Sequence, residues 1–169
     1  MAAGPTARLF LAVWPDAAAR EALVDWQRRW HWPRGARPTA PDRLHLTLHF
    51  IGQVPMARIA EVAAGLAVDF EPFELSFSRP ALWRGGLALA MPETVPPALT
   101  ALHGRLADAL QALALPVERR PFKPHLTLAR EADGAVPPDE PLTCRWTADA
   151  YALVQSAGGY RTLRRYPAR

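Results

Sequence analysis

The sequence predicts a mixed fold of helices and strands that consists of two similar lobes. The tetrapeptide His-Leu-Thr-Leu occurs twice, beginning at His45 and at His125. The same order of strand, helix and loop precedes each copy, with one helix starting near Asp16 and the other near Val95, 29 and 30 residues before the histidine. With 169 residues, half of them hydrophobic, the chain is long enough for one core. We expect a pseudo-two-fold axis between the lobes, with the motif strands facing each other.

The first half of the chain reads as a strand, a helix, a loop, a strand and a second helix. Asp16 is a plausible cap for the first helix. Leu23, Trp26 and Trp30 follow at three- and four-residue spacing and predict one buried stripe on it. The expected elements are a strand (8–14), a helix from Asp16, a loop rich in proline (33–42), a strand (44–51) and a helix (57–66).

The second half repeats this order and ends in a hairpin. Leu99, Leu102 and Leu106 belong to an apolar helical stripe, and His103 at its border is interpreted as a structural or surface residue. The Gly158-Gly159 pair indicates a turn between two strands. The expected elements are one or two strands broken near Pro80 (73–83), a strand (86–91), a helix (94–115), loops (116–124 and 133–141) and strands (125–130, 143–155 and 160–166).

Strand alternation places the polar residues of each motif on one face. His45 and Thr47 share a face in the first copy, and His125 and Thr127 do so in the second, while the leucines between them point toward the helices. Two residues of rise separate each imidazole from its hydroxyl by about 6–7 Å. Both groups can therefore reach one phosphate placed between them.

Two histidines and two threonines around one site suit in-line displacement at phosphorus. A neutral histidine can take a proton from water, and a protonated one can give a proton to a leaving sugar oxygen. The threonine hydroxyls can hold the non-bridging oxygens. A single His-Leu-Thr-Leu strand is more simply a half-buried strand with polar residues toward solvent, but two copies in a matched repeat favour a functional site.

We expect neither a metal nor another cofactor. His45 and His49 lie about 13 Å apart along a strand, too far to bind one ion, and alternation leaves Phe50 on the leucine side. His49 is interpreted as an outer cleft or surface residue without a catalytic role. The one cysteine, Cys144, lies in a predicted strand and is interpreted as a small buried hydrophobic residue.

The charge and the ends of the chain bear on partner and location. The net charge is +4, and of the twenty basic residues only Lys123 is not arginine, which is compatible with an anionic substrate. The start, residues 1–5, lacks the pattern of a signal peptide, and no apolar run approaches a membrane span. We therefore expect a cytoplasmic protein without a membrane partner.

The chain resembles the two-histidine (2H) phosphoesterase superfamily, and within it the bacterial RNA 2',3'-cyclic phosphodiesterases, also known as 2'-5' RNA ligases (LigT or ThpR type). The doubled HxTx motif with its flanks is a specific signal, and the resemblance covers nearly the whole chain. The segments that carry it are Arg8-Leu-Phe-Leu-Ala, Leu44-His-Leu-Thr-Leu-His-Phe-Ile-Gly, Phe122-Lys-Pro-His-Leu-Thr-Leu-Ala-Arg and Leu153-Val-Gln-Ser.

The resemblance implies a bilobal, duplicated α+β fold: a single domain over 1–169, with an antiparallel sheet in each lobe, outer helices and a central cleft carrying both HxTx motifs. It implies metal-independent hydrolysis of RNA 2',3'-cyclic phosphate ends to 2'-phosphates. By the same resemblance, His45 is the proton donor, His125 is the proton acceptor, and Thr47 and Thr127 bind the phosphate.

Two further residues match positions that look placed to hold the nucleobase in relatives. These are Phe10 and Arg130, for which a core phenylalanine and a surface arginine are the simpler interpretation. Strand alternation puts Arg130 on the other face of the strand from His125, unless the strand bends between them. The segment Ala157-Gly-Gly-Tyr is shorter than is usual in the family, so the hairpin should border the cleft differently.

Two alternatives to hydrolysis stay open. The same site could join RNA ends as a 2'-5' RNA ligase, since a catalyst speeds both directions, or the chain could be a non-catalytic module that binds RNA ends. In each case we expect a monomer whose partner is RNA with a 2',3'-cyclic phosphate end or a nucleoside 2',3'-cyclic phosphate.

Overall fold

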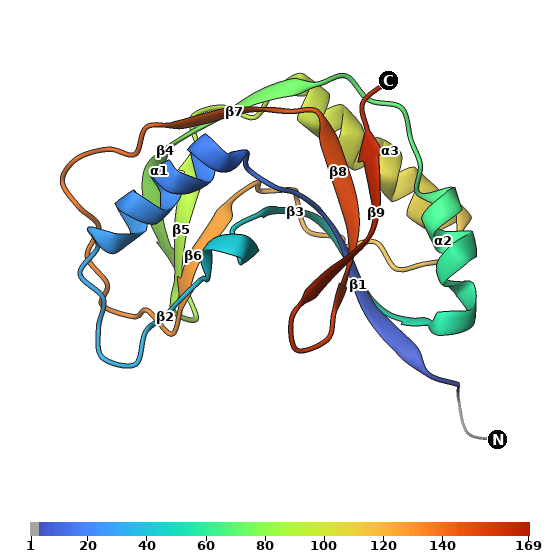
Figure 1. Cartoon of the computed structure of the whole chain (residues 1–169), viewed down its shortest axis with the longest axis horizontal. Helices are drawn as coiled ribbons and strands as arrows, with labels where there is room; N and C mark the ends of the chain where they lie inside the picture. The colour runs from blue at the N-terminus through green and yellow to red at the C-terminus, as the bar shows by residue number, and fades with distance from the viewer. Residues whose placement is uncertain (1–3) are drawn as a thin grey trace.

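Within residues 4–169, which the computed structural model describes, nine strands form one antiparallel sheet that three α-helices cover (Figure 1). The predicted α+β class is confirmed. The strands are β1 (Thr6–Val13), β2 (Arg37–Pro38), β3 (Leu46–Pro55), β4 (Phe73–Trp83), β5 (Leu87–Pro92), β6 (Leu126–Arg130), β7 (Cys144–Ala148), β8 (Ala150–Ser156) and β9 (Tyr160–Pro167). The helices are α1 (Ala17–Arg28), α2 (Ile59–Gly65) and α3 (Pro97–Ala112).

The two motif strands meet at the centre of the sheet. The strand order is β7-β4-β5-β6-β3-β1-β8-β9, with the short β2 also paired to β6. β3 and β6 join through one pair, Leu46 opposite Leu126. The two predicted sheets are thus two four-stranded groups joined edge to edge at this pair. Leaving out the short β2, which pairs with β6, four strands lie on each side of this pair, an arrangement that suits the predicted duplication.

The two long helices cross over to the opposite group of strands. α1 follows β1 but packs on the β7 side, where the Trp26 indole donates a hydrogen bond to the carbonyl of Glu140. α3 follows β5 but packs on β3, where His49 donates to the carbonyl of His103. Figure 1 shows α1 at the β4–β5 end of the sheet and α3 at the β8–β9 end. Each group of strands is therefore covered by the helix that begins in the other.

The faces of the sheet carry different clusters. The motif leucines on the helix side are fully buried in the main core, as predicted, among them Leu46 and Leu126. A smaller cluster on the opposite face contains Phe10 and Val154, with Trp14 packed against it. Because the helices cover only the face with the motif leucines, the opposite face, which carries the motif histidines, has no helix over it.

Two predicted strands differ from the observed ones. The expected strand over 143–155 is two strands, because the chain leaves β4 after β7 and turns at Asp149 to pair with β1 as β8. β4 continues through Pro80 without a break. Only β5 pairs with β4 at Pro80, so this proline lies on an open edge, where its missing N–H is tolerated.

Two observations bear on the predicted location. In the part of the chain described, none of the helices is both long and apolar enough to span a bilayer. The signal-peptide prediction rests partly on residues 1–3, which lie outside the described residues.

Candidate active site

Both histidine motifs contain a β-bulge at the same position. β1 pairs with Thr47 and with His49 but skips Leu48 between them. β5 skips Leu128 of the second motif in the same way. A bulge adds one residue to a strand, so the side chains that follow it exchange faces. The two motifs therefore share a backbone irregularity as well as a sequence.

The bulges overturn the alternation predicted for residues after the motifs. His49 is 3% exposed and lies on the core side against α3, so the prediction of a cleft or surface residue was wrong. Phe50 is 53% exposed and lies 6.5 Å from the Phe10 ring on the histidine face, not with the leucines. Arg130 returns to the histidine face, where its charge acts on both His45 and His125. The bulge at Leu128 is the strand bend that was needed to bring Arg130 to the same face as His125.

The register of the central pair brings the four predicted phosphate-site residues together. With Leu46 opposite Leu126, one further residue on each side places His45 across from Thr127 and Thr47 across from His125. Directly opposite residues in an antiparallel pair have Cβ atoms about 4.5–5.5 Å apart. All four side chains are partly buried. Each histidine thus faces the threonine of the other motif.

Both imidazoles are fixed by the same backbone contact. The Nδ1 atom of His45 lies 2.6 Å from the carbonyl oxygen of Arg43, and that of His125 lies 2.7 Å from the carbonyl oxygen of Lys123. A carbonyl only accepts, so Nδ1 carries the hydrogen in both rings. The Nε2 atoms are then the ones that gain and lose protons.

The Nε2 atoms differ in their partners. The Nε2 atom of His45 accepts a hydrogen bond from the Thr47 hydroxyl at 2.9 Å. The predicted separation of 6–7 Å between imidazole and hydroxyl was therefore wrong for this pair, because the side chains lean together. Among the described residues, His125 Nε2 has no corresponding bond from Thr127.

Aromatic rings surround His45 on three sides. Trp14 stacks on it with ring centroids 4.9 Å apart, Phe10 lies at 5.2 Å, and Tyr160 stands edge-on at 5.5 Å. Phe10 thus lies beside the histidine but is only 4% exposed, and its expected role at the nucleobase stays a prediction. His125 has one such neighbour, Trp83, at 4.6 Å.

The two tryptophans and Tyr160 were not predicted as site residues. A signal for Trp14 was present, because Phe10 and Trp14 are four residues apart and strand alternation places them on one face. Tyr160 and Trp83 reach the histidines from hairpin ends, whose position depends on the strands they pair with. No local pattern in the sequence marks them.

Burial lowers the pKa of both motif histidines. For His45, burial is the largest cause, and the charges of Arg130 and His125 lower the pKa further. For His125, burial is again the largest cause and lowers the pKa, the hydrogen bond to the Lys123 carbonyl partly opposes this shift, and the charge of Arg130 lowers the pKa further. Both rings therefore favour the neutral form in the free protein, and a bound phosphate anion would raise both pKa values.

The short hairpin between β8 and β9 is tied to the His45 side. The Arg43 guanidinium donates to the carbonyl of Gly158 at 3.2 Å and lies 5.1 Å from the centre of the Tyr160 ring. The Trp14 indole donates to the carbonyl of Asp42 at 3.1 Å. These contacts hold Tyr160 and Trp14 against His45. The short segment from Ala157 to Tyr160 therefore borders the site through Tyr160.

A buried glutamine supports the backbone of the second motif. Gln27 on α1 donates to the carbonyl of the bulged Leu128 at 2.8 Å and to that of Thr39 at 3.0 Å. Thr39 itself donates from its backbone to Leu128 at 2.8 Å and from its hydroxyl to the carbonyl of Thr127 at 2.9 Å. The signal that could have found Gln27 is a polar residue four positions after Leu23, inside the apolar stripe.

The remaining histidine and cysteine candidates are structural. The rings of His49 and His103 stack at 4.0 Å, and burial and the charge of His49 lower the pKa of His103 to about 4. Cys144 is buried as predicted, and burial raises the pKa of its thiol to about 12, which removes it as a nucleophile.

No metal centre is evident in the described chain. Over residues 4–169, histidine, cysteine and acidic side chains nowhere gather in a group of three or more that could hold an ion. Metal independence stays a prediction.

These features define a two-histidine site on one face of a duplicated-looking sheet. A family model described as the 2'-5' RNA ligase superfamily matches residues 14–159. The chain belongs to this superfamily, and the predicted resemblance is confirmed.

Individual relatives support the same assignment. The chain is 32% identical over 131 residues to an RNA 2',3'-cyclic phosphodiesterase of Escherichia coli strain K12, covering 76% of this chain and 74% of that protein. It is 33% identical over 165 residues to an RNA 2',3'-cyclic phosphodiesterase of Thermus thermophilus, covering 88% and 81%. A crystal structure of E. coli LigT complexed with 3'-AMP superposes with a TM-score of 0.87 at 26% identity, covering 97% of this chain and 99% of that one.

Proposed function

We propose that this chain is a hydrolase that opens 2',3'-cyclic phosphates at RNA ends and leaves a 2'-phosphate. The observation that carries the proposal is the pair of Nε2 atoms. Both Nδ1 atoms are held by backbone carbonyls, and both rings lie on one sheet face with two threonines. The relatives named as RNA 2',3'-cyclic phosphodiesterases, at 32% and 33% identity, support this substrate class.

The reaction needs one proton taken and one proton given. Nε2 of His125, in its neutral form, accepts a proton from water as the water oxygen forms a bond to phosphorus. The bond between phosphorus and the 3'-oxygen breaks on the opposite side, and Nε2 of protonated His45 donates its proton to that oxygen. His45 ends neutral and His125 ends protonated, and proton exchange with solvent resets the pair. No metal takes part.

The threonines and Arg130 orient and stabilise the phosphate. Thr47 and Thr127 donate hydroxyl hydrogens to the non-bridging oxygens, which carry more charge in the transition state. When His45 is protonated, Thr47 can accept from its Nε2 and still donate to phosphate, because a hydroxyl does both. Arg130 adds a positive charge beside both histidines.

The nucleoside then lies along the histidine face, with the base near Phe10 and the Arg130 guanidinium, where stacking and cation–π contacts are available. Since Phe10 is nearly buried, only an edge of its ring can serve a base. The protein acts in the cytoplasm as a monomer on RNA ends or on nucleoside 2',3'-cyclic phosphates.

The proposal is tested by incubating the protein with a nucleoside 2',3'-cyclic phosphate in the presence of EDTA. Phosphorus NMR should show conversion to the nucleoside 2'-phosphate without the 3'-isomer. Retained turnover in chelator supports metal-independent chemistry. Absence of product at every pH between 4 and 9 (on the order of two units either side of the histidine range) contradicts the enzyme.

A second candidate function is 2'-5' joining of RNA ends, which the description of the matching superfamily favours. The same residues would act in the same roles, with His125 taking a proton from the attacking 5'-hydroxyl in place of water and His45 giving a proton to the leaving 3'-oxygen. Supplying an RNA with a free 5'-hydroxyl together with a cyclic-phosphate end separates the two activities. We expect hydrolysis to exceed joining, because water competes at every turnover.

A further inference from the structure

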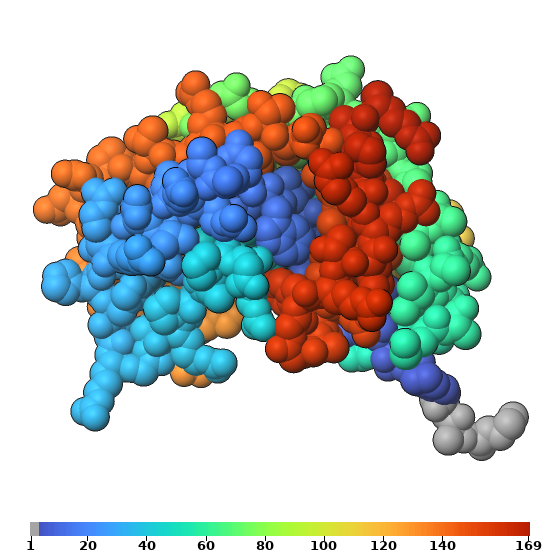
Figure 2. Space-filling model, viewed as in Figure 1, coloured from blue at the N-terminus to red at the C-terminus, as the bar shows by residue number. Residues whose placement is uncertain are grey.

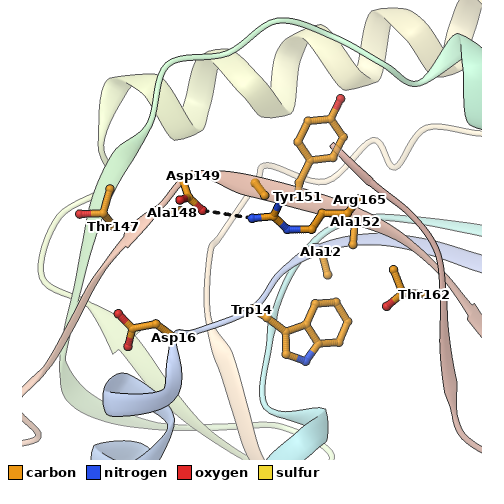
Figure 3. Close-up of a pocket in the computed structure, with 11 residues that line it drawn as sticks. Ala12, Trp14, Asp16, Thr147, Ala148, Asp149, Tyr151, Ala152, Thr162 and Arg165 are labelled. Atoms are coloured by element: carbon orange, nitrogen blue, oxygen red, sulfur yellow. Dashed lines mark ion pairs between the residues drawn. The ribbon is translucent and has the colours of Figure 1, made fainter. Parts of the chain in front are cut away.

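A hollow lies beside the histidine site and is lined in part by Trp14. It measures about 360 Å³. Figure 3 shows Trp14 on one wall and Arg165 above it, with Asp149 and Thr162 at the margin. In Figure 2 the blue residues near Asp16, the orange β7–β8 segment and the red β9 meet on one face of the molecule. Nothing in the proposed chemistry uses this space.

The strand order connects the hollow with His45. Val13 pairs with Leu46 of β3, so the next residue, Trp14, lies beside His45. On its other edge β1 pairs with β8, where Ala152 lies opposite Ala12. Neighbouring strands are about 4.8 Å apart, so the hollow over β8 lies about 10 Å from β3. Trp14 thus lines the hollow and also stacks on His45.

The floor of the hollow consists of small side chains. Four alanines line it: Ala12 of β1, Ala148 at the end of β7, and Ala150 and Ala152 of β8. The indole of Trp14 is held in place by its bond to the Asp42 carbonyl at 3.1 Å. A fixed indole above an alanine floor forms a slot for a flat ring, and volumes of this size hold small ligands.

The polar groups at the margin fit an uncharged ligand with several hydroxyls. Asp149 faces the Arg165 guanidinium at 3.6 Å, which leaves this pair neutral. Asp16 adds a second carboxylate, and Thr147 and Thr162 add hydroxyls. Two carboxylates against one guanidinium disfavour a bare phosphate. Carboxylates accept hydrogen bonds from sugar hydroxyls and base amino groups.

We propose that this hollow binds the nucleoside that precedes the cyclic-phosphate nucleotide of an RNA end. The base of that nucleoside stacks beside Trp14, and its ribose hydroxyls face the carboxylate and hydroxyl margin. The inference rests on the proposed function, because it takes the cyclic phosphate to lie between His45 and His125. It makes the protein prefer an RNA end over a free cyclic nucleotide.

The test compares two substrates: a nucleoside 2',3'-cyclic phosphate and a dinucleotide with the same cyclic end. We expect kcat/KM of the natural chain to be about tenfold higher for the dinucleotide, the size expected of one base stacked on an aromatic ring. Ala152→Leu fills the floor of the hollow from β8, two strands away from β3. This variant should lose the tenfold preference and keep its rate on the mononucleotide within about twofold. Ala60→Leu, the same change at an exposed position of α2, should behave like the natural chain.

Equal kcat/KM of the natural chain on the two substrates would overturn the inference, and so would an Ala152→Leu protein that keeps the preference. If Ala152→Leu does not fold, Thr162→Leu fills the hollow from β9 and takes its place. If the natural chain turns over neither substrate, the proposed function fails. The subsite is then judged by calorimetric binding of a linear dinucleotide 3'-phosphate against a mononucleotide 3'-phosphate, in the natural chain and in Ala152→Leu.

Discussion

The two copies of the motif share a backbone but differ in their surroundings. In each copy a carbonyl two residues earlier holds Nδ1, and a bulge follows at the second leucine. His45 also accepts from Thr47 and is packed among aromatic rings, whereas His125 has one aromatic neighbour. The repeated backbone thus leaves Nε2 of each ring to exchange protons and places both rings on the same face of the sheet. The surrounding side chains distinguish the two histidines.

The largest effect should come from removing either histidine. His45→Ala and His125→Ala should each lower kcat by about 10²- to 10⁴-fold, because each removes one proton-transfer group. The double variant should be hardly slower than the worse single one, since the two groups act as a unit. Steady-state rates on a nucleoside 2',3'-cyclic phosphate measure this. His31→Ala, at an exposed position, is the control and should keep full activity.

The threonines should separate the two copies. Thr47→Val and Thr127→Val should each lower kcat/KM by about 10- to 10²-fold through loss of a hydrogen bond to a charged group. Only Thr47→Val also removes a bond to Nε2 of its own histidine. It alone should therefore shift the pH profile of kcat/KM. Equal shifts in both variants would mean that the observed asymmetry has no part in the reaction.

Gln27 supports the second copy alone. Gln27→Met leaves the carbonyl of Leu128 with one donor fewer and should lower the free energy of unfolding by about 1–3 kcal/mol. It should also lower kcat a few-fold by loosening the strand that carries Thr127. Urea denaturation and steady-state kinetics check the two effects. Gln53→Met, at an exposed position of β3, should change neither.

The smallest effect should come from the charge that both copies share. The positive charge of Arg130 lowers the pKa of both histidines, so Arg130→Met should raise both pKa values and move both limbs of the kcat/KM profile to higher pH. We expect a shift below about one unit, because the guanidinium is exposed. Arg37→Met, on the paired strand β2, should leave the limbs in place. A shift toward lower pH in Arg130→Met would contradict the assignment.

The sequence was sufficient for the fold class and for choosing four residues that the structure brings together, whose roles stay predictions. Apolar runs and helical stripes predicted most elements, since burial of one face imposes its period on each. Strand alternation correctly predicted the face of each motif side chain from His45 to Thr47 and from His125 to Thr127. Their meeting at Leu46 and Leu126 could only be expected from the repeat.

What the sequence could not provide depends on partners far along the chain. The alternation continues unbroken from Leu46 to Phe50, so no local pattern marks the bulge at Leu48, which arises from pairing with β1. The same holds for Leu128, whose carbonyl is bound by Gln27 from a helix that begins in the other half. The crossing at Asp149 was missed because β7 and β8 form one continuous strand pattern.

The most direct test of the account is the pH dependence of kcat/KM in the two single-histidine variants. The natural chain should give a bell whose limbs belong to the pair. His45→Ala, which lacks the donor, should lose the alkaline limb and rise to a plateau as pH increases. His125→Ala, which lacks the acceptor, should lose the acidic limb and rise to a plateau as pH falls. Loss of the same limb in both variants, or an unchanged bell in either, would contradict the division of roles between the two lobes.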